Sequence, residues 1–297
     1  MSHKHIIFVP GKNPKPAPEQ HKALLWRSIT EGVKRADPDI IDSLSENKQN
    51  FHLADWNYLY YHQYKDSSQD LPWIDALINT HGPTKQDIQQ ANGFHVKLDR
   101  FLFSVADLFP IIIHFLPKTI RMTAEETNRY FYNENNIACD IREKLKNILR
   151  PLLANNEKIL IIGHSLGSVV SYDTLWELSH LEQLEGKLDF LTIGSPLGMN
   201  YVQHRIMGHA EKGQKRYPSL ISHWTNIASV GDVTALDREI HDDFSEMLKL
   251  GIIDHLQDHC KGIYNFFKND QGLNCHRSYG YLVNPAVGKV VADWWKS

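Results

Sequence analysis

The sequence predicts an α/β fold, in which a mostly parallel sheet is flanked by helices. Short β-branched or aromatic runs, bounded by Gly, Pro or Asn, alternate with longer segments of helical periodicity, and this alternation is typical of βαβ units. A composition of 42% hydrophobic and 23% charged residues excludes the collagenous, coiled-coil and disordered classes. We therefore expect one globular domain over residues 1–297.

Six runs of residues are the candidate strands of this sheet. They are residues 5–9, 52–58, 159–162, 190–193, 224–228 and 263–267. The segment before the third strand has apolar residues at helical spacing, namely Ile137, Ile141, Leu145, Ile148, Leu149 and Leu152. This spacing predicts a helix that packs against the sheet.

Residues 66–136 contain no convincing strand pattern, and we expect them to form a helical cap inserted into the domain. The cap includes a long apolar run over residues 101–117, FLFSVADLFPIIIHFLP. Pro110 interrupts the run, which also carries Asp107 and His114, so it falls short of a membrane-spanning helix. A buried helical hairpin and an apolar lid that contacts an acyl chain or a membrane surface both remain open.

Charge and cysteine content restrict the partners and the compartment. A formal net charge of −3 provides no broad electropositive surface, so we expect no nucleic-acid partner. Cys139, Cys260 and Cys275 are an odd number of widely spaced cysteines without a CxxC pair, which favours reduced thiols. The first apolar run, IIFVP, is too short for the core of a secretory signal peptide, so we expect a cytoplasmic location.

The segment EKILIIGHSLGSVVSYDTLWEL places a GxSxG motif between a buried strand and an amphipathic helix. In this context the serine occupies a sharp, strained turn, and only small residues two positions before and after it avoid a collision. Gly163 and Gly167 meet that need around His164, Ser165 and Leu166. The motif predicts that Ser165 is the nucleophile of an α/β-hydrolase fold.

The tetrahedral intermediate of such an enzyme needs hydrogen-bond donors for its oxyanion. The backbone N–H of Leu166, at the start of the helix, is the first candidate. The second donor in this fold comes from the loop after an early strand, where IIFVPGKNPKP offers Gly11 and Lys12.

A serine hydroxyl needs a histidine base, and the base needs a carboxylate, in the chain order serine, acid, histidine. Asp232 follows the strand at residues 224–228 and is our candidate acid, with Asp237 as its main competitor. Asp189 precedes its strand, and Asp173 lies two turns along the helix after Ser165.

His276 follows the last predicted strand and precedes the final helix, and it is the candidate base. His255 and His259 lie four residues apart beside Asp254, which on a helix would place both on one face. Without an HExxH motif or a third ligand we interpret this pair as a solvated helix face, and we expect no metal and no organic cofactor.

The motifs resemble those of serine esterases and lipases over residues 4–11 and 157–295. More narrowly, GHSLGSVVSYDTL, LTIGSPLGMN and NIASVGD are similar to segments of the intracellular phospholipase A1 group that carries a DDHD domain. This resemblance implies Ser165, Asp232 and His276 as a catalytic triad and an acyl ester, such as a phospholipid, as substrate.

We therefore expect a serine hydrolase that cleaves small-molecule or lipid acyl esters through an acyl-serine intermediate, with peripheral membrane contact through the cap. Thioesterase or acyltransferase activity would use the same triad, because only the group that attacks the acyl-enzyme differs. A non-catalytic binding protein of the same fold is the alternative from another class.

Overall fold

In the computed structural model, residues 3–93, 95–100 and 126–297 are described. A parallel six-stranded sheet forms the centre, in the order β2-β1-β3-β4-β5-β6. The strands are β1 (Lys4–Val9), β2 (Phe51–Leu53), β3 (Lys158–His164), β4 (Leu188–Ile193), β5 (Ile221–Ile227) and β6 (His255–His259). A separate antiparallel pair consists of β7 (Lys268–Asn269) and β8 (Gly272–Leu273).

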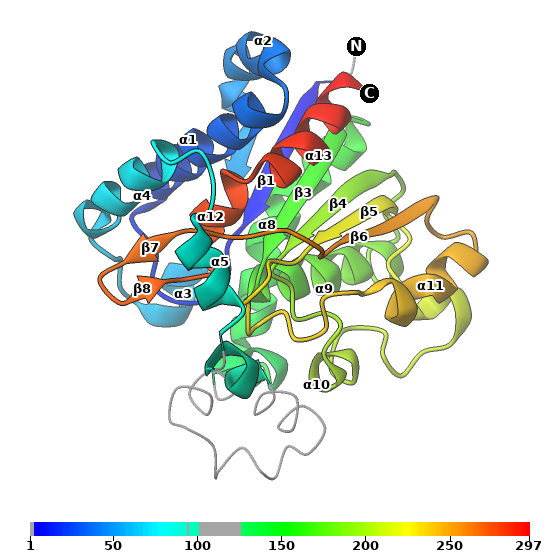
Figure 1. The fold of residues 1–297 in the computed structure, drawn as a ribbon. Helices are drawn as coiled ribbons and strands as arrows, with labels where there is room; N and C mark the ends of the chain where they lie inside the picture. Colours follow the sequence, from blue (N-terminus) through cyan, green and yellow to red (C-terminus); the bar gives the residue numbers. More distant parts are fainter. Residues whose placement is uncertain (1–2, 94, 101–125) are drawn as a thin grey trace.

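Helices cover both faces of the sheet (Figure 1). On one face lie α1 (Pro18–Ala36), α12 (Ser278–Leu282) and α13 (Pro285–Lys296), and on the other lie α8 (Ile137–Ala154), α9 (Leu166–His180) and α11 (His241–Lys249). Alternate residues of β3 feed the two cores: Ile159 and Ile161 pack toward α8 and α9, while Leu160 and Ile162 pack toward α1 and α13. These two cores explain why β3 is apolar at four successive positions, residues 159–162.

Shorter helices connect these elements. They are α2 (Ile41–Glu46), α3 (Asn57–Tyr61), α4 (Leu71–Ile78), α5 (Lys85–Ala91) and α10 (Asn200–Gln203). The helix predicted before β3 is confirmed as α8, in which Ile141, Leu145 and Leu149 are fully buried. The predicted α/β-hydrolase fold is likewise confirmed: a parallel sheet with helices on both faces, entered by a strand-to-helix turn after β3.

The strand predictions at residues 5–9, 159–162, 190–193 and 224–228 are confirmed by β1, β3, β4 and β5. The strand predicted at 52–58 is correct only at its start, because β2 ends at Leu53 and α3 begins at Asn57.

The last predicted strand is wrong. Residues 263–267 form no strand; Phe266 and Phe267 instead pack as irregular chain into the core on the α1 side. The sixth strand is β6, which contains the HLQDH sequence that we interpreted as a helix face. β6 is polar because it is a half-exposed edge strand of the sheet. Successive side chains of a strand point to opposite faces, so His255 and His259, four residues apart, lie on one face, just as they would on a helix.

Within 66–136, the described residues form α4, α5 and helical stretches at 95–100 and 126–131, and no strand occurs among them. α4 packs into the core through Ile74 and Leu77, so the start of this span belongs to the body of the domain. Residues 101–125, with most of the apolar run, lie outside the described residues. The cap therefore stays a prediction.

Two further observations concern the described part of the chain. None of its helices combines the length and the apolar composition needed to cross a bilayer. Cys139, Cys260 and Cys275 are free thiols.

Candidate active site

Ser165 alone links β3 to α9, and its backbone has φ 55° and ψ −129°. A residue other than glycine rarely adopts this backbone conformation, and holding it there costs on the order of 1–3 kcal/mol. Neighbouring hydrogen bonds hold the turn: Ser165 N–H donates to the Ile193 carbonyl at 3.2 Å, and the Ser165 carbonyl accepts from Ser168 N–H at 3.0 Å. The turn presents the hydroxyl at the carboxyl end of the sheet.

The two glycines of the motif are required by close packing. A Cβ on Gly163 would lie 2.7 Å from the Ser168 Cα, and one on Gly167 would lie 2.2 Å from the Val9 carbonyl oxygen. Neither backbone position can move without displacing β1 or α9. The predicted need for small residues on both sides of Ser165 thus has a direct steric cause.

Ser165, His276 and Asp232 form one continuous hydrogen-bonded chain. His276 Nε2 lies 2.8 Å from Ser165 Oγ, and His276 Nδ1 lies 2.8 Å from Asp232 Oδ2 and 3.0 Å from Oδ1. Asp232 is completely buried, and Ser165 is 2% exposed. The structure therefore brings together the three residues that the sequence predicted as nucleophile, base and acid.

The Asp232 carboxylate is held by donors on both oxygens. Oδ1 accepts from the N–H groups of Thr234 at 2.8 Å and Ala235 at 3.3 Å, while Oδ2 accepts from the Tyr281 hydroxyl at 2.7 Å. Burial alone would raise the pKa of Asp232, but the attraction of His276 and these hydrogen bonds outweigh it, so the net pKa lies below the usual range. The acid is therefore ionised at neutral pH.

Two residues of this arrangement, Tyr281 and Gly194, were missed by the sequence analysis. Tyr281 is fully buried on α12, and its hydroxyl also accepts from Ser229 N–H at 2.8 Å, so it ties the acid loop to the last helices. Gly194 follows β4 with φ +55°, and a Cβ there would lie 2.8 Å from Asp232 Oδ2 and 3.2 Å from His276 Nδ1. The GSP sequence at the end of β4 was the available signal for Gly194, whereas nothing in the sequence marks Tyr281.

The oxyanion candidates lie beside the serine. Leu166 is the first residue of α9, so its N–H has no acceptor within the helix. Gly11 approaches so closely that a Cβ on it would lie 2.7 Å from the Ser165 Cβ. Lys12 follows it, and its ammonium group forms an ion pair with Glu126 at 3.3 Å.

The histidine of the motif, His164, supports the base. Its Nε2 lies 2.8 Å from the carbonyl oxygen of His276, so this nitrogen carries the proton and donates it. Burial, followed by the proximity of His276 and Lys15, keeps the pKa of His164 well below its ordinary value. His164 is therefore neutral and fixes the backbone of His276.

The competing acids lie elsewhere. Asp237 accepts from the N–H of Glu239. Asp173 is a buried residue of α9, and the Tyr130 hydroxyl donates to it at 2.9 Å. Asp189 pairs with His223, whose Nδ1 lies 2.6 Å from Asp189 Oδ1.

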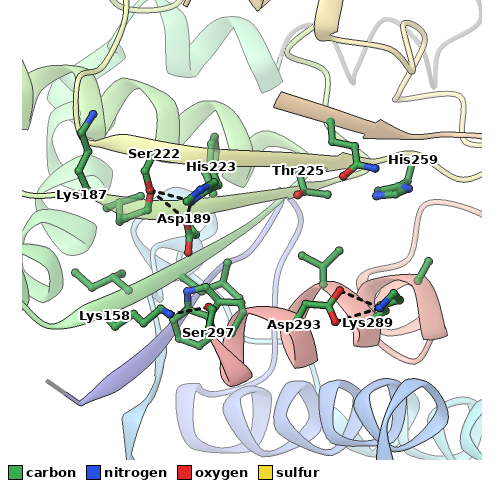
Figure 2. Close-up of a pocket in the computed structure, with 18 residues that line it drawn as sticks. Lys158, Lys187, Asp189, Ser222, His223, Thr225, His259, Lys289, Asp293 and Ser297 are labelled. Atoms are coloured by element: carbon green, nitrogen blue, oxygen red, sulfur yellow. Dashed lines mark hydrogen bonds and ion pairs between the residues drawn. The ribbon is translucent and has the colours of Figure 1, made fainter. Parts of the chain in front are cut away.

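Asp189 and His223 line a groove of about 750 Å³ between the sheet and α13 (Figure 2). The other labelled side chains around the groove are Lys158, Lys187, Ser222, Thr225, His259, Lys289, Asp293 and Ser297. Ser165, Asp232 and His276 do not line it. The groove is thus separate from the hydrogen-bonded triad.

The described residues hold no group of three His, Cys, Asp or Glu side chains that could bind a metal ion. In β6, His255 Nε2 contacts Gln257 Oε1 at 3.2 Å, while His259 lines the groove. The hydrogen bonds of His276 to Ser165 and to Asp232 are an arrangement suited to nucleophilic attack by Ser165, assisted by a histidine–carboxylate pair.

A known protein family matches this chain. The profile of the family described as lipase (class 3) matches residues 69–232, more than half of the chain, and the match includes Ser165 and ends at Asp232. The comparisons with curated proteins and with solved structures found no match. With its α/β-hydrolase architecture and this match, the chain belongs to the class 3 lipase family.

Proposed function

We propose that this protein is a serine hydrolase that cleaves the carboxylic esters of lipids through an acyl-serine intermediate. The observation that carries the proposal is the unbroken chain from Asp232 through His276 to Ser165, with 2.8 Å on each side of the imidazole. Membership of the class 3 lipase family supports a lipid ester as the substrate.

In the proposed reaction, His276 Nε2 takes the proton of Ser165 as Oγ attacks the ester carbonyl carbon. The Leu166 N–H and one N–H of the Gly11–Lys12 loop stabilise the oxyanion of the tetrahedral intermediate. As the intermediate collapses, the bond to the alcohol oxygen breaks and His276 gives its proton to that oxygen.

Water completes the cycle. His276 removes a proton from the water as the water oxygen attacks the acyl-serine. When the second intermediate collapses, the bond to Ser165 Oγ breaks, His276 returns its proton to Oγ, and the carboxylic acid is released. Asp232 remains ionised throughout, fixing the tautomer of His276 and stabilising its positive charge.

We further propose that the span 66–136, apart from its start, where α4 packs into the body of the domain, caps this site. Two contacts of described residues support it: Arg100 donates to the carbonyl oxygen of Asp232 at 2.7 Å, and Glu126 pairs with Lys12. Two parts of the span, at Arg100 and at Glu126, thus lie at the acid loop and at the oxyanion loop. The residues expected to contact an acyl chain or a membrane, in 101–117, lie outside the described part of the chain.

Hydrolysis of p-nitrophenyl esters by the wild type, Ser165→Ala and His276→Ala tests the proposal. Loss of each side chain should lower turnover by about a thousandfold to a millionfold while the protein stays folded, because the triad acts as a unit. Phospholipid vesicles are the lipid substrate to test first, in view of the resemblance to the phospholipase A1 group. Wild-type turnover in folded Ser165→Ala would refute the assignment of the nucleophile.

A further inference from the structure

The loop that carries the acid has no strand or helix of its own. This acid loop, residues 228–240, connects β5 to α11. Within it, the N–H groups of Thr234 and Ala235 turn back onto Oδ1 of Asp232, at 2.8 and 3.3 Å. A side chain that binds the backbone two residues further on forms a turn typical of Asp. The alignment of the carboxylate therefore depends on what holds the backbone of this loop in place.

Arg100 holds the acid loop through its carbonyl groups. Nη1 donates to the carbonyl oxygen of Asp232 at 2.7 Å and to that of Ala235 at 3.2 Å. Nη2 donates to the carbonyl oxygen of Leu236 at 2.5 Å. A guanidinium is planar and presents its N–H donors in a fixed geometry, so it can bind several acceptors at once. One side chain thus fixes both the residue that carries the carboxylate and a residue whose N–H binds it.

These three bonds go to backbone carbonyl groups, and the carboxylate of Asp232 accepts from other donors. Its Oδ1 accepts from the two backbone N–H groups of the loop, and its Oδ2 accepts from the Tyr281 hydroxyl. His276 Nδ1 lies within 3.0 Å of both oxygens. The bonds of Arg100 therefore fix the loop without occupying the oxygens that serve the base.

α5 supports the same loop at the residue before Asp232. Gly231 has φ +87°, and a Cβ there would lie 2.8 Å from the carbonyl oxygen of Ala91 and 3.0 Å from its Cα. Ala91 is the last residue of α5 and is 4% exposed. Ala91 and Arg100 thus lie along the acid loop from Gly231 to Leu236, so the contact of Arg100 is part of a longer interface.

We propose that Arg100 is a positioning residue for the acid: by binding the carbonyl groups of the acid loop, it keeps two backbone N–H groups on the Asp232 carboxylate. This role rests on the ester hydrolysis proposed above, in which Asp232 orients and stabilises His276. Without the guanidinium, the loop carbonyls turn toward other donors and the two N–H groups leave Oδ1. The carboxylate then loses its fixed place beside Nδ1 of the base.

The test compares Arg100→Met and Arg100→Lys with the wild type. Met keeps much of the length of the side chain and removes every donor, whereas Lys keeps the charge without the planar fork. Arg35→Met is the matched control. Arg35, on α1, also donates to three backbone carbonyl groups, which lie in the body of the domain: those of Leu77 at 3.4 Å, Ile78 at 2.7 Å and Val283 at 3.4 Å.

We expect Arg100→Met to lower kcat on p-nitrophenyl acetate by about a hundredfold, the scale of a misplacement by about 1 Å, with KM within about threefold of the wild type. Arg100→Lys should fall between the two, and Arg35→Met should keep the wild-type kcat. The loss should be the same on the octanoate ester, because Arg100 acts on the acid and not on the acyl chain. Rates are referred to the amount of folded protein, so that unfolding is not counted as a loss of kcat.

A double-mutant cycle with Asp232→Asn shows whether the effect passes through the acid. Once the carboxylate is gone, replacing Arg100 by Met as well should change the residual kcat by less than about twofold, because the two residues act as one unit. A purely structural role would instead add its full loss to that of Asp232→Asn, and this result would overturn the proposal.

Unchanged kcat in the folded Arg100 variants would also overturn it, as would a loss that grows with the length of the acyl chain or an equal loss in Arg35→Met. If the wild type hydrolyses the ester and Ser165→Ala does not, any of these results removes only the role of Arg100. An inactive wild type would instead remove the proposed function itself.

Discussion

Replacing Asp232 by Asn tests how the acid controls the base. Asp232 Oδ1 accepts from two backbone N–H groups, those of Thr234 and Ala235. In the variant, the oxygen of the side-chain amide must face these two N–H groups. Its NH2 then takes the place of Oδ2, which lies 2.8 Å from His276 Nδ1. The NH2 then donates to Nδ1, and the proton of the imidazole moves to Nε2, where it can no longer accept the proton of Ser165.

From this change of tautomer we expect turnover of a short p-nitrophenyl ester to fall by roughly ten-thousandfold. Folding should survive, because the Tyr281 hydroxyl can rotate to accept from the new NH2. Asp237→Asn is the control and should stay close to the wild type, since Asp237 contacts the N–H of Glu239 rather than the base. If Asp237→Asn lost more activity than Asp232→Asn in well-folded proteins, the acid would be Asp237.

Three further predictions follow from the geometry of the site and of the core beneath it. Gly194→Ala should reduce kcat by about tenfold or more in an ester assay, because its Cβ would lie 2.8 Å from Asp232 Oδ2 at a positive φ; normal kcat would show that the contact yields without cost. Ser165→Gly should be inactive yet melt at or above the wild-type temperature, since glycine relieves about 1 kcal/mol of strain at φ 55°; a clearly lower melting temperature would contradict the strain. Burial raises the pKa of Asp173 to about 6. Between about pH 4 and 6 the native state therefore keeps a proton that the unfolded chain has released, and the free energy of unfolding falls as the pH rises through this range. Asp173→Asn should remove that fall, which is on the order of 3 kcal/mol, and urea unfolding of both proteins across this range measures it; parallel pH profiles would refute it.

The parts of the fold that sequence could predict are those with local causes. The apolar run ILII, the GxSxG turn and the periodicity of α8 each follow from neighbouring residues, and all three elements are present. β6 was misassigned because an edge strand half-exposed to solvent has polar residues, and its histidine spacing fits a strand and a helix equally well. The apolar residues of 263–267 are buried by tertiary packing without pairing to a strand. No local sequence pattern distinguishes such a segment from a buried strand.

The same distinction applies to the site. Chain order and motif context were enough to select Ser165, Asp232 and His276, of which His276 lies within hydrogen-bond distance of the other two. Tyr281 could not be selected, because its contact with Asp232 joins segments far apart in the chain.

The most direct test of the central claim is covalent labelling of the nucleophile. A fluorophosphonate probe should modify the native protein at a single site, and mass spectrometry of the peptides should place the added mass on Ser165. Labelling should disappear in Ser165→Ala and in heat-unfolded protein, because an activated serine depends on the folded triad. A folded wild type that stays unlabelled, or one labelled on another serine, would contradict the account.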